Sequence, residues 1–140
     1  MTDGERVYAY FGSHGLYCLD KTGKVLWKKM FKPYEMRNGW GTGASPILDG
    51  DQLIIVNDNM EDSWMASYDK LTGRQLWKTK RDEPSNWSTP YVWEHDGIRE
   101  LILTGRNRTR AYDLKGSERW SLKWKTRTSI VIPTPFEAHG

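Results

Sequence analysis

The chain has 140 residues, of which 37% are hydrophobic and 28% charged, and a net charge of +3 at pH 7. This length fits one domain, and the composition is that of an ordinary globular protein and excludes a disordered chain. No apolar run approaches the roughly 20 residues that a membrane-spanning helix needs, so no membrane span is expected.

The first residues, "MTDGERVYAYF", contain neither the basic segment nor the long apolar segment of a signal peptide. We expect no leader in this chain, and the sequence leaves the cellular location open. Cys18 is the only cysteine, so a disulfide within the chain is ruled out. The net charge is too small to indicate nucleic-acid binding by itself.

The first expected element is a strand at 6–11, "RVYAYF". Similar short runs follow at 52–56, "QLIIV", and at 100–104, "ELILT". All three are rich in β-branched, leucine and aromatic residues and are bounded by turn residues, as strands are. No segment has the sustained apolar periodicity of an amphipathic helix. The sequence therefore predicts an all-β fold.

Between these runs one phrase occurs three times. It reads "LDKTGKVLW" at 19–27, "YDKLTGRQLW" at 68–77 and "YDLKGSERW" at 112–120, so that its glycines are 50 and 43 residues apart. The aspartate can accept hydrogen bonds from backbone N–H groups ahead of it, and the glycine can adopt a positive φ. Each phrase is therefore expected to be a hairpin turn between two strands.

A second marker runs out of phase with the first. It is a Ser/Thr-Pro pair whose prolines, Pro46, Pro90 and Pro135, are 44 and 45 residues apart. Proline is tolerated at the first residue of a strand. Periods of about 40–50 residues are typical of propeller blades and of some helical arrays, and the strand patterns favour the propeller.

The fold prediction is a β-propeller with blades of four antiparallel strands and three blades per chain. The blades are expected at roughly 6–46, 47–90 and 91–135. The chain begins at a second strand, and the final first strand follows Thr134-Pro135. We expect oligomerisation to complete the ring.

The residue before the Leu or Tyr of each phrase is small: Cys18, Ser67 and Ala111. Small residues suggest the close approach of a neighbouring sheet, which the tryptophan can then cover. The phrase is repeated because each blade must dock on the next. The expected docking residues are Asp20, Gly23, Trp27, Asp69, Gly73, Trp77, Asp113, Gly116 and Trp120.

These phrases resemble the tryptophan-docking motif of the quinoprotein-like, PQQ-type propeller repeat, above all that of its BamB-like members. The resemblance covers almost the whole chain. It implies a propeller fold in which Trp27, Trp77 and Trp120 dock between adjacent blades. Family propellers have about eight blades, and the alcohol-oxidising members hold a quinone against a vicinal disulfide. Three blades and one cysteine do not reproduce that site, so no cofactor is expected.

No constellation of catalytic or metal-binding residues is evident. The three histidines show no metal-ligand spacing and are interpreted as surface turn residues: His14, His95 and His139. Asp58, Glu61 and Asp62 lie close together, but they lack the order of a known calcium loop. A solvated turn is the favoured interpretation, and the chain is predicted not to be an enzyme.

In "GRNRTR" the arginines Arg106, Arg108 and Arg110 alternate, so that in a strand they point one way. Together with Lys123, Lys125 and Arg127 they could contact phosphate or an acidic protein. A charged edge that discourages strand addition is the favoured interpretation.

Loops between blades are the predicted contact surface for partner proteins. Exposed aromatic residues mixed with Arg and Asn are typical of such surfaces. Packing of Trp40 and Trp87 around the central channel is an equally good explanation for the presence of these two tryptophans. The candidate residues are Arg37, Asn38, Trp40, Asn86, Trp87 and Arg127.

The predicted function is that of a non-enzymatic scaffold that binds itself, and possibly other proteins, with a dimer favoured over a trimer. One alternative is a fragment of a quinone-dependent or other extracytoplasmic enzyme. Another is a surface that binds anions or nucleic acid, which is disfavoured.

Overall fold

The computed structural model describes residues 1–125 and 130–138. It contains three antiparallel sheets. The first consists of β1 (Arg6–Tyr10), β2 (Leu16–Asp20) and β3 (Val25–Lys29). The second consists of β4 (Ile47–Asp49), β5 (Gln52–Asn57), β6 (Trp64–Asp69) and β7 (Gln75–Lys80). The third consists of β8 (Tyr91–His95), β9 (Ile98–Thr104), β10 (Arg108–Tyr112) and β11 (Glu118–Lys123).

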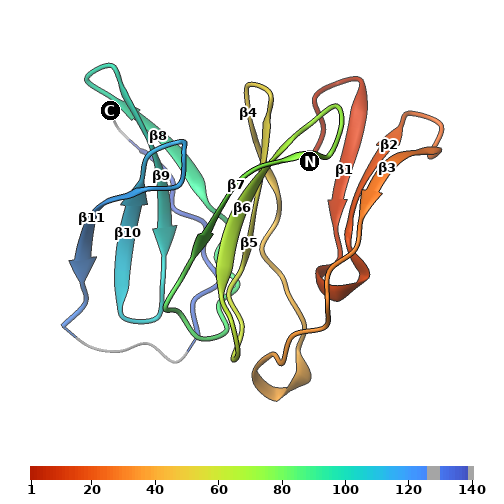
Figure 1. The fold of residues 1–140 in the computed structure, drawn as a ribbon. Coiled ribbons are helices and arrows are strands. Elements are labelled where there is room, and N and C mark those ends of the chain that lie inside the picture. The colour runs from red at the N-terminus through yellow and green to blue at the C-terminus, as the bar shows by residue number, and fades with distance from the viewer. Residues whose placement is uncertain (126–129, 139–140) are drawn as a thin grey trace.

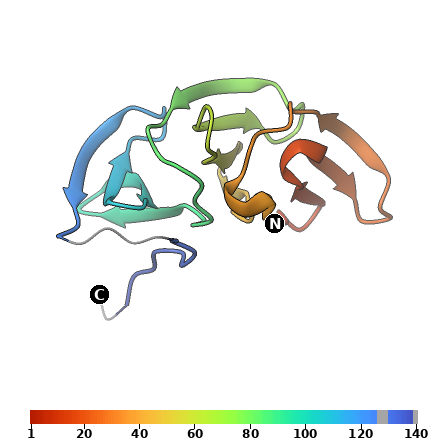
Figure 2. The same ribbon diagram turned by 90° about the horizontal axis from the view of Figure 1, so that it is seen from below.

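The three sheets stand side by side along an arc, and β3, β7 and β11 form its outer side (Figures 1 and 2). Strands that follow one another in the chain pair with one another in every sheet. The all-β class and the three blade-like sheets expected from the repeats are confirmed. Two short 3₁₀ turns, Gly12–His14 and Arg37–Gly39, are the only helical elements in the described part. Neither could cross a membrane.

The end of the chain differs from the prediction. Residues 130–138 contain no strand, although a first strand was expected after Thr134-Pro135. The carbonyl oxygen of Val131 accepts a hydrogen bond from Trp87 N at 3.0 Å, and that of Pro133 accepts one from Ser88 Oγ at 2.7 Å. The segment therefore lies beside the loop before β8, and no strand in the described part pairs with it.

The middle sheet is buried on both faces because its side chains alternate along each strand. Leu53 and Ile55 of β5 belong to the core shared with the first sheet. Ile54 and Val56 belong to the core shared with the third sheet. The continuous apolar run "QLIIV" thus supplies two interfaces, and the sheets are held together by apolar side chains between them.

Cys18 lies in the core between the first two sheets and is completely buried. It stands opposite Trp27 in the strand register, and burial raises the pKa of its thiol. We expect a thiol reagent to label the native protein slowly and the unfolded protein quickly, because the thiolate is the reactive form. Equal labelling rates with and without denaturant would contradict this.

Candidate functional site

The three repeated turns lie at one edge of the sheets, the upper edge in Figure 1. In the first, Asp20 Oδ1 accepts hydrogen bonds from the backbone N–H groups of Thr22 and Lys24, at 2.8 and 3.0 Å. The hydroxyl of Thr22 also donates to it and lowers the pKa of Asp20. Asp69 and Asp113 hold their turns in the same way. The short aspartate side chain thus fixes each hairpin locally.

Trp27 of the first sheet contacts the turn of the second. Its Nε1 donates a hydrogen bond to the carbonyl oxygen of Lys70 at 3.0 Å. Its ring lies against Gly73, where an added Cβ would be 2.8 Å from ring atom Cε3. Gly73 also has a φ of +69°. Both the close ring and the positive φ therefore require glycine at this position.

Trp77 repeats this contact between the second and third sheets. Its Nε1 donates to the carbonyl oxygen of Leu114 and to Gln52 Oε1, both at 3.0 Å. A Cβ added to Gly116 would be 2.7 Å from its Cε3. The acceptor carbonyl again belongs to the residue that directly follows the turn aspartate.

Trp120 and Gly23 are the two ends of this series. The side chain of Trp120 is 39% exposed, and its Nε1 donates to Glu100 Oε2 at 3.1 Å. Gly23 has a φ of +88°, and within the described part no atom beyond its own neighbours lies within 4 Å of its Cβ position. Of the three repeats, the described chain forms the Trp-to-turn contact twice.

A buried ion pair at the end of the second sheet is hydrogen-bonded to the third sheet. Arg81 and Asp58 are fully buried side chains whose Nε and Oδ1 atoms are 2.8 Å apart. Arg81 also donates to the hydroxyl of Tyr112 in β10 at 2.6 Å. Asn86 donates to Asp58 and to the carbonyl oxygen of Thr104. The sequence prediction of a solvated turn is therefore wrong for Asp58, and Asn86 is buried and not a surface contact residue.

The interpretation of "GRNRTR" as a charged edge is also wrong. Arg110 is buried, and its guanidinium pairs with Glu83 and Asp82. Strand β10 lies between β9 and β11 and is not an edge of the sheet. Carboxylates from the loop after β7 therefore neutralise Arg110.

The remaining loop candidates in the described part are Arg37, Asn38, Trp40 and Trp87. Trp40 is 57% exposed and contacts the ring of Trp87, with centroids 5.8 Å apart. Trp87 Nε1 donates to the carbonyl oxygen of Gly41 at 2.8 Å. Arg37 is half-buried and Asn38 is exposed. Arg127 lies outside the described residues.

The two described histidines, His14 and His95, lie in different sheets' segments, before β2 and at the end of β8. His14 is exposed in the first 3₁₀ turn. His95 is half-buried, with its ring stacked on Trp93 at 3.8 Å and its Nε2 3.2 Å from Glu100 Oε2, so it is more than a surface turn residue. His139 lies outside the described residues. In the part of the chain that the structure describes, no three His, Cys, Asp or Glu residues are grouped to hold a metal ion.

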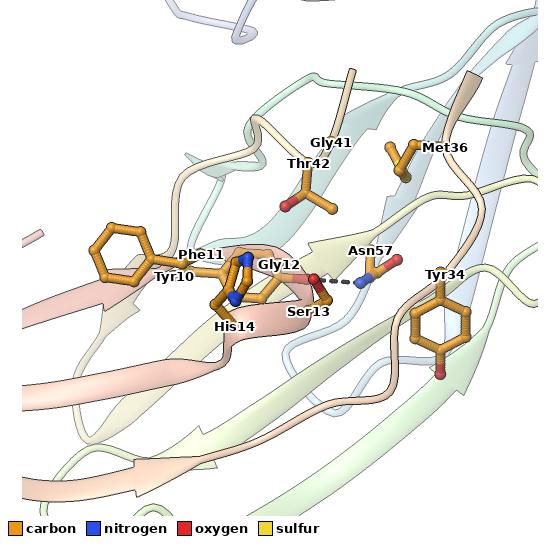
Figure 3. Close-up of a pocket in the computed structure, with 10 residues that line it drawn as sticks. All are labelled: Tyr10, Phe11, Gly12, Ser13, His14, Tyr34, Met36, Gly41, Thr42 and Asn57. Carbon is orange, nitrogen blue, oxygen red and sulfur yellow. Dashed lines mark hydrogen bonds between the residues drawn. The ribbon is translucent and has the colours of Figure 1, made fainter. Parts of the chain in front are cut away.

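A pocket of about 370 Å³ opens between the first two sheets, at the edge opposite the repeated turns (Figure 3). Asn57 donates to the hydroxyl of Tyr10 at 2.7 Å, and burial raises the pKa of Tyr10 to about 12. Among the described residues that line the pocket none is Lys, Arg, Asp or Glu. The lining residues are Tyr10, Phe11, Gly12, Ser13, His14, Tyr34, Met36, Gly41, Thr42 and Asn57.

Solved structures share the arrangement of the sheets. BamB from Moraxella catarrhalis is 19% identical, with a TM-score of 0.64 over 86% of this chain and 34% of that one. A europium-containing methanol dehydrogenase is 17% identical, with a TM-score of 0.60 over 84% of this chain and 22% of that one. A protein of unknown function from Bacteroides caccae is 13% identical, with a TM-score of 0.56 over 93% and 46%. At these identities the likeness shows the fold alone, and the chain spans less than half of each.

A search of the curated proteins finds no match. The family model described as outer membrane protein assembly factor BamB matches residues 1–132, which include all three repeated turns and every strand. The chain therefore belongs to the BamB-like family of PQQ-type repeat propellers.

Proposed function

We propose that this chain is a non-enzymatic protein-interaction segment and that its copies assemble head to tail into a closed ring. The observation that carries the proposal is a pair of apolar flanks, one on the first sheet and one on the third, that no other sheet of the described part covers. The residues of each flank occupy the same positions in the strand pairing as residues that are buried between sheets elsewhere in the chain. The docking roles of the repeated tryptophans are part of this proposal.

One flank belongs to the first sheet. Val7 pairs with Leu19 in β1 and β2, as Leu53 pairs with Tyr68 in β5 and β6. Leu53 is completely buried against the first sheet, whereas Val7 is 43% exposed. The side of the first sheet that faces away from the second is thus built like a surface that receives a neighbour.

The other flank belongs to the third sheet. Tyr91 pairs with Ile102 in β8 and β9, as Ile47 pairs with Ile54 in β4 and β5. Ile47 and Ile54 pack on the third sheet. Tyr91 and Ile102 instead line a pocket of about 360 Å³, together with Trp93, Trp120 and residues 135–138.

A second copy fits both flanks, because the contact that joins sheets inside the chain would continue from one chain to the next. Such a head-to-tail interface forms a ring if the rotation closes and a filament if it does not. Two chains supply six sheets, within the usual propeller range of about 4–8, whereas three supply nine. We therefore favour the dimer.

The inner edge of β1 is where an exchanged terminal strand from a second copy would have to pair. Met1 lies along it, and its carbonyl oxygen accepts a hydrogen bond from Tyr8 N at 2.8 Å. The exchange of residues 133–138 onto this edge would have to displace Met1 and Thr2. Deletion of residues 133–140 therefore separates strand exchange from docking of the flanks alone.

We expect light scattering to give twice the 16.4 kDa of one chain, with dissociation on dilution. Val7→Lys should weaken the assembly because it places a charge on a flank. Met60→Lys is the matched control, since Met60 is 49% exposed in the loop after β5, away from both flanks. A folded monomer at every micromolar concentration would contradict self-assembly, and saturable binding of a quinone and metal would contradict the non-enzymatic role.

A further inference from the structure

We infer that residues 20–23, here called the acceptor turn, bind Trp120 of a second copy. In this contact Trp120 Nε1 donates a hydrogen bond to the carbonyl oxygen of Lys21, and the ring lies on Gly23. The inference rests on the proposed head-to-tail assembly and assigns residues to both sides of its interface.

The position of the acceptor follows from the two contacts inside the chain. Trp27 donates to Lys70 and Trp77 donates to Leu114. Lys70 directly follows Asp69, and Leu114 directly follows Asp113. By the same rule the acceptor in the first turn is the residue after Asp20, which is Lys21.

The acceptor turn is already in the receiving conformation. Its φ of +88° at Gly23 matches the +87° of Gly116. Asp20 Oδ1 holds the backbone N–H groups of residues 22 and 24, as Asp113 Oδ1 holds those of residues 115 and 117. Within the described part of the chain the space over Gly23 is open, whereas rings fill it at Gly73 and Gly116. The turn therefore needs no rearrangement before it binds an indole ring.

Trp120 is placed as the donor. It stands opposite Ala111 in the register, as Trp77 stands opposite Ser67. Trp77 Nε1 is shared between Gln52 of its own sheet and Leu114 of the next. Trp120 Nε1 already donates to Glu100 of its own sheet. A bond to Lys21 of a second copy would be its second acceptor, as Leu114 is for Trp77. A half-exposed tryptophan is typical of an interface hot spot.

The test measures self-association by sedimentation equilibrium for Trp120→Ala and Gly23→Ala. Each should raise the dissociation constant at least about tenfold, as loss of a hot-spot contact does. In the single chain a Cβ added at Gly23 contacts no other described atom, so the only cost of the substitution there is the backbone strain of a positive φ. Gly50→Ala is therefore the matched control, because Gly50, in the turn between β4 and β5, has a φ of +58° and open space at its Cβ position. We expect its dissociation constant to stay within about twofold.

A mixture of the two variants tests the head-to-tail pairing directly. The Trp120→Ala chain keeps an intact acceptor turn, and the Gly23→Ala chain keeps an intact Trp120. Mixing should therefore restore one good contact and give a heterodimer that neither variant forms alone at that concentration. Circular dichroism in the near ultraviolet confirms that each variant is folded.

The outcomes separate the inference from the proposed function. If the unmodified chain associates but both variants associate equally well, the acceptor turn is not the docking site, although self-assembly stands. The same holds if mixing restores nothing. If the unmodified chain stays monomeric, self-assembly and the inference both fail.

Discussion

Replacement of Arg81 by methionine is expected to lower the free energy of unfolding by about 3–5 kcal/mol, the usual cost of leaving a buried charge without its partner. Asp58 has no exposed side-chain surface, so water cannot solvate its carboxylate once the guanidinium is gone. Asn86 still donates to Asp58, but a neutral amide compensates only in part. Tyr112 would lose its hydrogen bond from Arg81 at the same time. Denaturant unfolding measures the change.

Lys32→Met is the control for this prediction. Lys32 and Glu61 form an ion pair at 3.4 Å, but their side chains are 61% and 43% exposed. Its loss should cost less than about 1 kcal/mol, because water and salt already screen the pair. If the two variants were equally stable, Arg81 would not be the element that ties the second sheet to the third.

Trp77→Ala is expected to cost about 2–4 kcal/mol, somewhat below the value for a fully buried tryptophan because this ring is half-buried. The substitution removes the ring from Gly116 and the hydrogen bond to Leu114. It also removes a partner of Gln52. Loss of these contacts should loosen the third sheet from the second, and thermal unfolding with two spectroscopic probes would show it.

Trp40→Ala provides the comparison. Trp40 is 57% exposed, and its described ring contact is with Trp87. Its replacement should cost no more than about 1.5 kcal/mol, the upper value for one aromatic pair. A Trp77→Ala variant no less stable than Trp40→Ala would remove the basis for a docking role of the repeated tryptophan.

The repeated turns were predictable because their chemistry is local. An aspartate that accepts hydrogen bonds from N–H groups two to four residues ahead needs no other part of the chain. The apolar runs of β5 and β9 were predictable for a similar reason, since strand character follows from residue type. The sequence pattern did not predict that residues 133–138 would lack a strand. In the structure the segment 130–138 is instead held by hydrogen bonds to Trp87 and Ser88 in the loop before β8, which no local pattern indicates.

The buried polar groups were not predictable from the sequence. "RDEPSNW" reads as an exposed loop and "GRNRTR" as an exposed edge. In the structure Arg81, Glu83 and Arg110 are buried. Arg81 meets a partner 23 residues away and Arg110 meets one 27 residues away. A charged residue is buried only where an oppositely charged partner is present. That partner is distant in the sequence, so no local pattern identifies it.

The sequence by itself determined that Asp, Gly and Trp recur in one order, and hence that the chain is a series of like hairpins. Only the tertiary structure decided which tryptophan meets which glycine. Trp27 lies four residues after Gly23, yet it packs on Gly73 in the next sheet. Its side chain points out of its own sheet, as strand side chains do. The surface that it covers therefore depends on how the sheets stack, which is set by the apolar cores between them.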